Sequence, residues 1–356
     1  MIHSGFACIV GRPNAGKSTL TNALVGAKVA IASSKPQTTR HAIRGIVNRP
    51  DAQLVLIDTP GLHRPRTLLG QRLNDLVYAS WAEVDVIGVC LPANQRVGPG
   101  DKFLLGEIAK LPKRPALVAL ATKSDLVSPA RMAEHLLAIA ALAAPVLPAS
   151  DSVPPLAGSV PPLADSGESA PGAALAIPSG SEPGAAQAVP SQSARAVPAL
   201  EWAAVIPVSA LTGDQVDIVS DELVKLLPEG PRYYPDGEIT DEPDRTLVAE
   251  LIREAALEGA REELPHSITV EVDEMGLREG RSEDHPLLDI YASLIVERDS
   301  QKGIIIGHRG ERLREIGAAA RRQISALMGT PVYLDLHVKV LKDWQRNPKF
   351  LNRLGF

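Results

Sequence analysis

The chain has 356 residues, of which 45% are hydrophobic and 22% charged, and its formal net charge is −5. That length allows two or three domains with packed cores. Both cysteines, Cys8 and Cys90, lie in apolar strand-like runs, which argues against a disulfide or metal site and indicates a reducing compartment. The sequence has neither a signal-peptide pattern nor an apolar stretch long enough to span a bilayer, so we expect a cytoplasmic protein.

The first predicted element is a strand–loop–helix unit. An apolar run at 6–10 predicts a buried strand and the run 19–25 predicts a helix, and the loop between them fits the phosphate-binding pattern G-x-x-x-x-G-K-[ST]. Glycines let the backbone curl around phosphate oxygens, Lys17 supplies a positive charge, and the Ser18 hydroxyl is placed to hold Mg²⁺. The predicted nucleotide-binding residues here are Gly11, Arg12, Pro13, Asn14, Ala15, Gly16, Lys17, Ser18 and Thr19.

A polar segment follows at 36–40 and contains two threonines. A threonine hydroxyl here can become the second protein ligand of Mg²⁺ when a γ-phosphate is present, which would make the segment a switch. We favour Thr39, with Thr38 as the alternative. Three nearby cations, Arg12, Lys35 and Arg40, are candidate charge stabilisers, although a solvated surface charge is the simpler interpretation of each.

The motif D-x-x-G follows a predicted strand at 54–57. A carboxylate at the end of a strand can complete the Mg²⁺ shell, and the N–H of Gly61 can bind a terminal phosphate. Asp58 is therefore the third predicted metal residue beside Ser18 and Thr39. The predicted nucleotide-binding residues of this motif are Asp58, Thr59, Pro60, Gly61 and Leu62.

A third apolar run, at 116–121, precedes Thr122, Lys123, Ser124 and Asp125. The Asp125 carboxylate can accept both N–H donors of a guanine edge, and the Lys123 stem can lie over the base. A helix-capping role of Asp125 is the alternative. After a predicted strand at 205–208, the backbone of Ser209, Ala210 and Leu211 could touch the base carbonyl.

A low-complexity segment separates a predicted helix at 130–143 from that last strand. Residues 145–200 hold 11 of the 30 prolines and only five charged residues, and Ser-Val-Pro-Pro-Leu-Ala occurs at 152–157 and again at 159–164. We interpret this Pro/Ala/Ser-rich stretch as a disordered insertion within the first domain. The predicted boundaries are 1–228 for that domain, 229–240 for a linker and 241–356 for a second domain.

The second domain contains Gly307, His308, Arg309 and Gly310, which fit the G-x-x-G loop of KH domains. Helix periodicity at 245–257 and 310–327 and strand patterns at 268–272, 288–296 and 331–341 predict the order helix, strand, strand, helix, helix, strand. The basic residues Arg309, Arg312 and Arg314 are expected to meet an RNA backbone. Apolar residues Ile305, Ile306, Leu313 and Ile316 are expected to form the groove floor and core.

Charge is distributed unevenly along the chain. Residues 297–356 contain 12 Lys and Arg against 6 Asp and Glu, a net charge of +6 on a chain that is negative as a whole. A basic section on an acidic protein is typical of a nucleic-acid contact, and a solvated helix face is the alternative. Aromatic residues make up only 3%, so base stacking cannot be the main mode of recognition.

The strings GRPNAGKST, PQTTRH, DTPGLH, TKSD and VSALTG resemble those of translation-factor-related P-loop GTPases, and most closely the Era family. This resemblance implies a doubly wound, mostly parallel α/β GTPase domain followed by an α+β KH domain of the bacterial type. It also implies a monomeric, Mg²⁺-dependent GTPase that uses GTP and GDP, binds the 3′ region of 16S rRNA and acts in assembly of the 30S ribosomal subunit. The family's fourth motif begins with Asn where this chain has Thr122, so we expect weaker guanine affinity with specificity kept.

The hydrolysis mechanism must differ from that of Ras-like GTPases, in which a glutamine orients the attacking water. Leu62 occupies that position here. Some similar GTPases use the P-loop asparagine to hold K⁺, and Asn14 matches that residue. We therefore expect slow intrinsic hydrolysis accelerated by K⁺, with Lys17, Thr39, Gly61 and Asn14 as the catalytic residues.

Two other classes of function fit the same sequence. Leu62 and Thr122 are compatible with an RNA-binding module whose nucleotide turnover is vestigial. The basic stretch around Trp344 suits a GTP-gated switch that meets a protein partner at the inner face of the cell membrane, as a peripheral contact.

Overall fold

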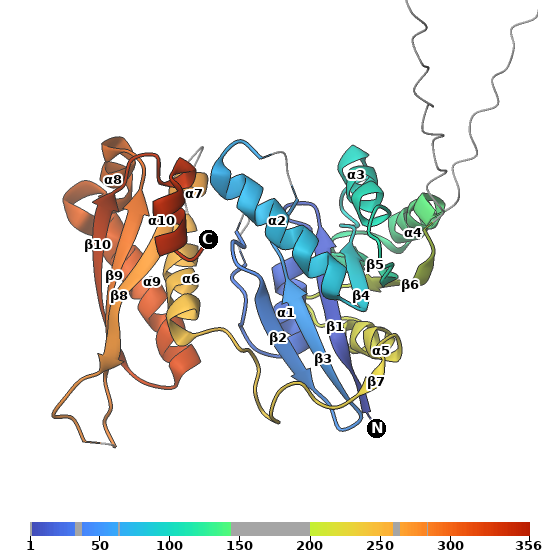
Figure 1. Cartoon of the computed structure of the whole chain (residues 1–356), viewed down its shortest axis with the longest axis horizontal. Helices are drawn as coiled ribbons and strands as arrows, with labels where there is room; N and C mark the ends of the chain where they lie inside the picture. The colour runs from blue at the N-terminus through green and yellow to red at the C-terminus, as the bar shows by residue number, and fades with distance from the viewer. Residues whose placement is uncertain (1, 33–37, 63–64, 144–199, 259–263, 283) are drawn as a thin grey trace, which may run out of the picture. The chain divides into compact units, whose positions relative to one another are not determined.

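The computed structural model describes residues 2–32, 38–62, 65–143, 200–258, 264–282 and 284–356 (Figure 1). The predicted insertion at 145–200 therefore lies outside the described residues except for Leu200, and Lys35 lies outside them too. The described residues on both sides of the insertion belong to one compact unit.

The N-terminal part is built on a mostly parallel sheet in the order β2-β3-β1-β4-β5-β6. Neighbours from β3 to β6 run parallel, whereas β2 pairs antiparallel with β3 and a two-residue strand, β7, pairs antiparallel with β1. The strands are β1 (Ile2–Gly11), β2 (Ile43–Asn48), β3 (Ala52–Asp58), β4 (Val86–Cys90), β5 (Ala116–Thr122), β6 (Trp202–Val208) and β7 (Glu229–Gly230).

Helices cover both faces of this sheet because its strands alternate their side chains between two apolar cores. In β1, Ala7 and Ile9 pack into one core with α1 (Lys17–Val25) and α5 (Val216–Lys225). Their neighbours Cys8 and Val10 pack into the other core, with α2 (Leu68–Glu83), α3 (Pro99–Ile108) and α4 (Pro129–Ala143). The predicted doubly wound α/β fold is confirmed.

The C-terminal part has a three-stranded sheet in the order β10-β9-β8, with β8 antiparallel and β10 parallel to β9. Its elements are α6 (Asp244–Leu257), α7 (Leu264–Ser267), β8 (Thr269–Leu277), β9 (Leu288–Val296), α8 (Asp299–Ile306), α9 (Glu311–Met328), β10 (Val332–Val340) and α10 (Pro348–Arg353). Side chains of α6, α9 and β9 share one apolar core. Apart from the short α7 and α10, this is the predicted order, and the KH fold class is confirmed.

The stretch expected to be a linker, 229–240, lies along the N-terminal sheet. It starts as β7, and the backbone N–H groups of Tyr233 and Tyr234 donate to Oε1 of the buried Gln53 at 2.7 and 2.9 Å. The N–H of Ile46 in β2 donates to the carbonyl of Ile239 at 2.8 Å. The chain that follows α5 is therefore anchored to the sheet by hydrogen bonds.

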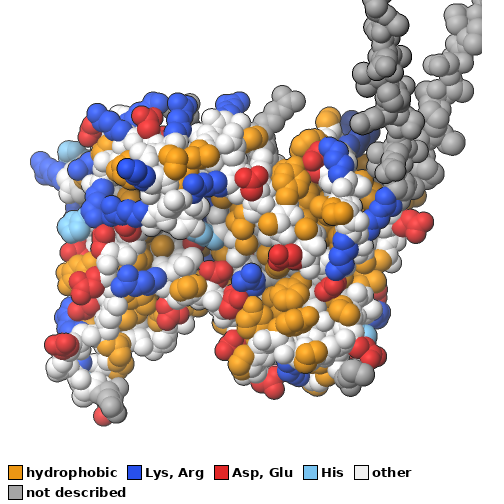
Figure 2. All heavy atoms as spheres, in the orientation of Figure 1, with side chains coloured by type: hydrophobic (Ala, Val, Ile, Leu, Met, Phe, Trp, Pro, Cys, Tyr) orange, Lys and Arg blue, Asp and Glu red, His pale blue; other side chains and the backbone are white. Residues whose placement is uncertain are grey.

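The surface of the C-terminal domain carries its positive charge unevenly. In Figure 2, Lys and Arg side chains gather over the part of this domain where Figure 1 shows α8 and α10. Exposed cations of these elements and of the turns beside them are Arg298, Arg309, Lys342, Arg346 and Lys349. The net positive charge of residues 297–356 is thus exposed in part on this face of the C-terminal domain.

Both cysteines are free and buried, as expected. Burial raises the pKa of the Cys8 and Cys90 thiols to about 12. They remain protonated near neutral pH and act as small apolar residues of the cores.

Candidate nucleotide and RNA sites

The predicted nucleotide motifs meet at one edge of the parallel sheet. Gly11, Asp58 and Thr122 end β1, β3 and β5, and Ser209 directly follows β6. Residue Ile9 pairs with Asp58, and Thr122 pairs with Val208, so these strand ends lie level with one another. Ligands of open α/β folds bind at this carboxyl edge of the sheet.

The phosphate-binding loop depends on backbone conformations that favour glycine. Gly11 has φ +156°, and a Cβ there would lie 2.8 Å from the carbonyl oxygen of Cys90. Gly16 has φ +94° and directly precedes α1, whose N-terminal N–H groups are the ones that can bind phosphate. Lys17 is 8% exposed, and its ammonium group donates to the carbonyl of Arg12 at 3.2 Å, which holds it beside the loop.

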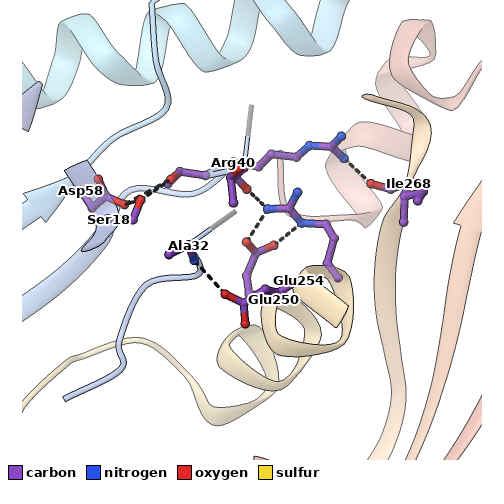
Figure 3. A network of polar contacts seen from close by, with 10 residues as sticks. Ser18, Ala32, Arg40, Asp58, Glu250, Glu254 and Ile268 are labelled. Carbon is purple, nitrogen blue, oxygen red and sulfur yellow. Dashed lines mark hydrogen bonds and ion pairs between the residues drawn. The ribbon is translucent and has the colours of Figure 1, made fainter. Parts of the chain in front are cut away.

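Three oxygen-bearing side chains form a cluster next to this loop. The Ser18 hydroxyl donates to Oδ2 of Asp58 at 2.7 Å, and the Thr39 hydroxyl donates to the same oxygen at 3.2 Å. The Ser18 and Thr39 hydroxyl oxygens are 3.2 Å apart. Figure 3 shows this cluster at the left of the view. The predicted metal residues therefore converge although they come from three separate segments.

The chemistry of the cluster fits a magnesium ion. Asp58 is fully buried, and its Oδ1 atom has no hydrogen-bond partner among the described residues. Burial raises the pKa of Asp58, against the opposing effects of Lys17 and of the two hydroxyl groups. Hydroxyl and carboxylate oxygens are ligands that Mg²⁺ prefers, and a cation would compensate the buried charge.

The D-x-x-G motif continues beside the lysine. A Cβ added at Gly61 would lie 3.8 Å from Nζ of Lys17, so the Gly61 backbone is close to the expected position of the terminal phosphate. Leu62 packs against the apolar core that contains Trp81. An aliphatic side chain placed there cannot orient a water molecule by hydrogen bonding.

The predicted guanine-binding residues lie on adjacent strand ends. Asp125 is exposed within a short 3₁₀ turn, Ser124–Leu126, and Lys123 before it has φ +60°. Ser209 is buried, and its hydroxyl accepts a hydrogen bond from the N–H of Thr212 at 3.2 Å. The structure thus presents an accessible carboxylate next to the loop that contains Ser209, Ala210 and Leu211.

Two of the candidate charge stabilisers have other contacts. Arg12 donates through Nε to Oδ1 of the fully buried Asp101 at 2.7 Å. Arg40 is 1% exposed and donates to the carbonyl of Ile268, in the C-terminal domain, at 2.7 Å. The surface-charge interpretation of Arg40 is therefore wrong, because sequence-local polarity does not reveal packing against residues more than 200 positions away.

The G-x-x-G loop sits between α8 and α9. Gly307 has φ +72°, and a Cβ there would lie 2.6 Å from Cβ of Arg312, so a larger residue requires the loop to move. Gly310 has φ +77°. The side chains of His308 and Arg309, between the glycines, are exposed. This short turn leaves its backbone and its basic side chains accessible to a nucleic-acid backbone.

A groove of about 290 Å³ begins at this loop and runs between α9 and β10. Its floor is aliphatic and its helix side includes small residues and two arginines. The lining residues are Gly310, Leu313, Arg314, Gly317, Ala318, Arg321, Leu334 and Leu336.

The groove differs in part from the sequence prediction. Of the apolar residues expected to form the groove floor and core, Leu313 lines the groove, and Ile305 and Ile316, 1% exposed, lie in the core. Arg312 does not line the groove either: it donates to the carbonyl of Glu258 and lies 3.6 Å from Glu315. Sequence reasoning missed Arg321 and Leu334, although i, i+7 spacing from Arg314 could have found Arg321.

Comparison with known proteins gives a consistent answer for both halves of the chain. A family model described as a 50S ribosome-binding GTPase matches residues 6–123, and a KH-domain model matches residues 263–345. A protein of Nocardioides sp. named GTPase Era is 59% identical over 99% of this chain and 96% of its own length. The GTPase Era of Streptomyces coelicolor is 56% identical over 99% of this chain and 95% of its own length.

The chain belongs to the Era family of GTPases. The protein is accordingly a GTPase, which hydrolyses GTP.

Solved structures of the family agree over the whole length. A variant of Aquifex aeolicus Era bound to GDP·AlF₄⁻ has a TM-score of 0.79 at 31% identity, covering 99% of both chains. Era in complex with MgGDPNP and nucleotides 1506–1542 of 16S ribosomal RNA also has a TM-score of 0.79 at 31% identity, covering 100% of this chain and 99% of that one. Among the described residues of this chain, no helix is both long enough and apolar enough to cross a membrane.

Proposed function

We propose that this protein is a GTP-controlled switch that binds the 3′ region of 16S rRNA through its KH domain and acts in assembly of the small ribosomal subunit. The observation that carries this proposal is that one chain holds both the Ser18–Thr39–Asp58 cluster and an open groove beside the G-x-x-G loop. The similar complex with 16S rRNA nucleotides joins the same two domains over nearly the full chain.

The nucleotide would be held by the four strand-end motifs. Residues 11–19 surround the phosphates, with Lys17 and the Gly61 N–H stabilising the terminal phosphate. Ser18, Thr39 and Asp58 would hold Mg²⁺. Residues 122–125 and 209–211 would bind guanine, with Asp125 as the acceptor for its N–H groups.

Hydrolysis would depend on a potassium ion held by Asn14, because Leu62 cannot position water. Asn14 has φ +60°, a conformation that Asn and Asp adopt more readily than other residues with side chains. Asn14→Asp therefore changes the chemistry of the ligand with little backbone strain. We expect GTP turnover to fall when Na⁺ replaces K⁺ and this ion dependence to be lost in Asn14→Asp. An unchanged rate in either experiment contradicts the potassium role.

RNA would be clamped by the backbone of the G-x-x-G loop, with bases entering the α9–β10 groove. Arg309 and Arg314 lie at the loop and Arg321 lies farther along the groove. Arg314 donates to the carbonyls of Arg309 and Gly310 at 3.3 and 3.4 Å, which keeps its charge over the loop. Arg312 is expected to support the loop and not to contact RNA.

A monomer acting in the cytoplasm is the expected form. The matching family model is described as 50S ribosome-binding, but the complex that resembles this chain over its full length contains RNA of the small subunit. Sedimentation with purified 30S and 50S subunits separates the two possibilities. Peripheral contact with the membrane is a separate expectation, which co-sedimentation with lipid vesicles tests.

The deciding experiment measures GTP hydrolysis in K⁺ buffer with and without an RNA of nucleotides 1506–1542. Arg321→Ala should weaken RNA binding about tenfold. Arg322→Ala is the matched control, because Arg322 is the exposed neighbour on α9 and does not line the groove. Stimulation by this RNA and not by a scrambled sequence supports the proposal. Equal effects of the two substitutions, or turnover indifferent to RNA, would overturn it.

A further inference from the structure

Helix α6 of the C-terminal domain presents three charged side chains that are buried against the N-terminal domain. Glu250, Arg253 and Glu254 are 5%, 1% and 8% exposed. Burying ionisable groups is costly unless they are paired and hydrogen-bonded. Figure 3 shows Glu250 and Glu254 on this helix, with Glu254 bonded to Ala32 of the N-terminal domain. The partners of Glu254 and Arg253 in that domain lie on the two sides of residues 33–37.

Glu254 holds the chain on the N-terminal side of residues 33–37. Its Oε1 atom accepts a hydrogen bond from the backbone N–H of Ala32 at 2.9 Å, and its Oε2 atom pairs with the Lys28 ammonium group. The downstream side is held by Arg253, whose Nη2 donates to the backbone carbonyl of Thr38. Consecutive residues of α6 therefore hold both flanks of residues 33–37, which lie outside the described part of the chain.

The Arg253 guanidinium is itself fixed by Glu250, three residues earlier on the same helix. Nε donates to Oε1 at 2.9 Å and Nη2 donates to Oε2 at 2.6 Å. Burial alone would raise the pKa of Glu250, but the charge and hydrogen bonds of Arg253 outweigh it and lower that pKa. The pair is thus ionised and bidentate, with two hydrogen bonds between the side chains, a geometry that arginine provides and lysine does not.

The contact with Thr38 reaches the metal cluster through one peptide unit. The Thr38 carbonyl belongs to the planar peptide that ends at the nitrogen of Thr39, so holding the oxygen fixes the plane of that peptide. Thr39 is 5% exposed, and its hydroxyl oxygen is 3.2 Å from both Ser18 Oγ and Asp58 Oδ2.

The next residue strengthens this arrangement. Arg40 is the second buried guanidinium of the boundary, and it donates to Ile268 O and lies 5.5 Å from the centre of the Trp344 ring. The chain is thereby attached to the C-terminal domain on both sides of Thr39, through Thr38 and through Arg40. Arg253 differs from Arg40 because its bond is made to the peptide that carries Thr39.

We propose that Arg253 is a positioning residue of the nucleotide site, which holds the Thr38–Thr39 peptide so that the Thr39 hydroxyl faces the metal cluster. This inference rests on the proposed role of Thr39 as a magnesium ligand. Fixing the position of the Thr39 hydroxyl raises the affinity only for a ligand whose magnesium ion binds that hydroxyl. Arg253 therefore raises the affinity for a magnesium nucleoside triphosphate and leaves the affinity for the diphosphate unchanged.

The test compares the binding of Mg²⁺·GDPNP and Mg²⁺·GDP by the full chain. The double variant Glu250→Gln with Arg253→Met removes both buried charges and leaves neither unpaired. We expect its GDPNP affinity to fall about tenfold, its GDP affinity to stay within about twofold, and the Mg²⁺ concentration for half-maximal GDPNP binding to rise. Arg253→Lys keeps the charge but cannot make both hydrogen bonds to Glu250, so it should lose less GDPNP affinity. It replaces the double variant in the test if that variant does not fold. Arg245→Met, at an exposed position of α6, is the matched control.

A merely structural role of Arg253 would lower both affinities alike, and this result would overturn the inference, as would no loss at all. A double-mutant cycle with Thr39→Ala sharpens the distinction. Substituting Arg253 should have no further effect on GDPNP binding in the Thr39→Ala background. An effect that persists there would contradict the positioning role of Arg253. If Thr39→Ala leaves GDPNP affinity intact, the magnesium role of Thr39 fails. If it lowers that affinity but the Arg253 variants do not, only the present inference fails.

Discussion

The hydroxyl of Thr122, at the end of β5, donates a 2.6 Å hydrogen bond to the backbone carbonyl of Ala15 in the phosphate-binding loop. Thr122 is 4% exposed and Ala15 is fully buried. The residue that stands where the family motif has asparagine therefore joins the end of β5 to the loop that precedes α1. A threonine hydroxyl is sufficient for this connection.

Thr122→Val keeps the side-chain shape and removes the donor, which leaves the Ala15 carbonyl buried without this bond. An unsatisfied buried carbonyl costs about 1–3 kcal/mol. We expect GTP and GDP affinities to fall together by about tenfold or more. Titration with fluorescent nucleotides measures both.

Thr122→Asn is the companion variant and restores the residue typical of the motif. We expect it to bind GDP at least as tightly as the natural chain and to discriminate against ATP equally well, because Asp125 is kept. Weaker discrimination in Thr122→Asn, or unchanged affinities in Thr122→Val, would contradict this account.

Asp58→Asn should raise the melting temperature of the protein at pH 7 in the absence of nucleotide and Mg²⁺. Burial raises the pKa of Asp58 in the folded state, so the folded protein holds this proton more tightly than the unfolded chain does. The free energy of unfolding therefore falls as pH rises from the unfolded to the folded pKa, and the ionised group destabilises the fold above that range.

Melting scans of both proteins across pH 4 to 8 test this prediction. The advantage of Asp58→Asn should vanish at low pH, where the natural carboxyl group is also neutral. Adding Mg²⁺·GDP should stabilise the natural protein more than the variant, since a bound ligand stabilises by mass action. A variant that melts lower at pH 7 without ligand would refute the prediction.

Gly307→Ala should weaken RNA binding more than Gly310→Ala. Gly310 is in the left-handed helical region, which costs a residue with a side chain about 1–2 kcal/mol. Gly307, with φ +72° and ψ −176°, is in a region that is essentially restricted to glycine. Only at Gly307 does the added Cβ also collide, at 2.6 Å from Cβ of Arg312, whereas at Gly310 no atom lies within 4 Å. Filter binding of the 16S fragment measures the difference, and GTP hydrolysis without RNA serves as the control. Equal losses in the two variants would show that collision plays no part.

Arg12→Ala should lower stability and leave the turnover number for GTP within about threefold. Asp101 is fully buried, accepts from Arg12, and also accepts from the N–H of Gly98 at 2.8 Å, where it caps α3. Removing the arginine leaves a buried carboxylate with one partner fewer, at a cost of about 1–3 kcal/mol. Chemical denaturation and steady-state kinetics test the two halves of this prediction. A much larger loss of turnover would favour a catalytic charge on Arg12.

Much of the nucleotide site could be predicted because each of its motifs is local. A strand followed by a glycine-rich loop and a helix is encoded within about 20 residues, and the end of each parallel strand lies at the same sheet edge. Strand β2 and helices α2 and α3 were not predicted. β2 is an antiparallel edge strand, and helices of this kind depend for their stability on tertiary packing.

Local spacing and hydrophobic period were sufficient to predict the two fold classes, the order of the domains and the motifs that we propose for phosphate, guanine and RNA. Long-range packing could not be predicted in this way: it brings Thr122 to Ala15 and buries both Arg40 and Arg253. It also places Arg321, and not Arg312, along the groove. The residues of these long-range contacts are far apart in the chain, so their pairing depends on how sheets and helices are stacked. A charged residue in the sequence carries no sign of whether folding will leave it in water or bury it beside a partner.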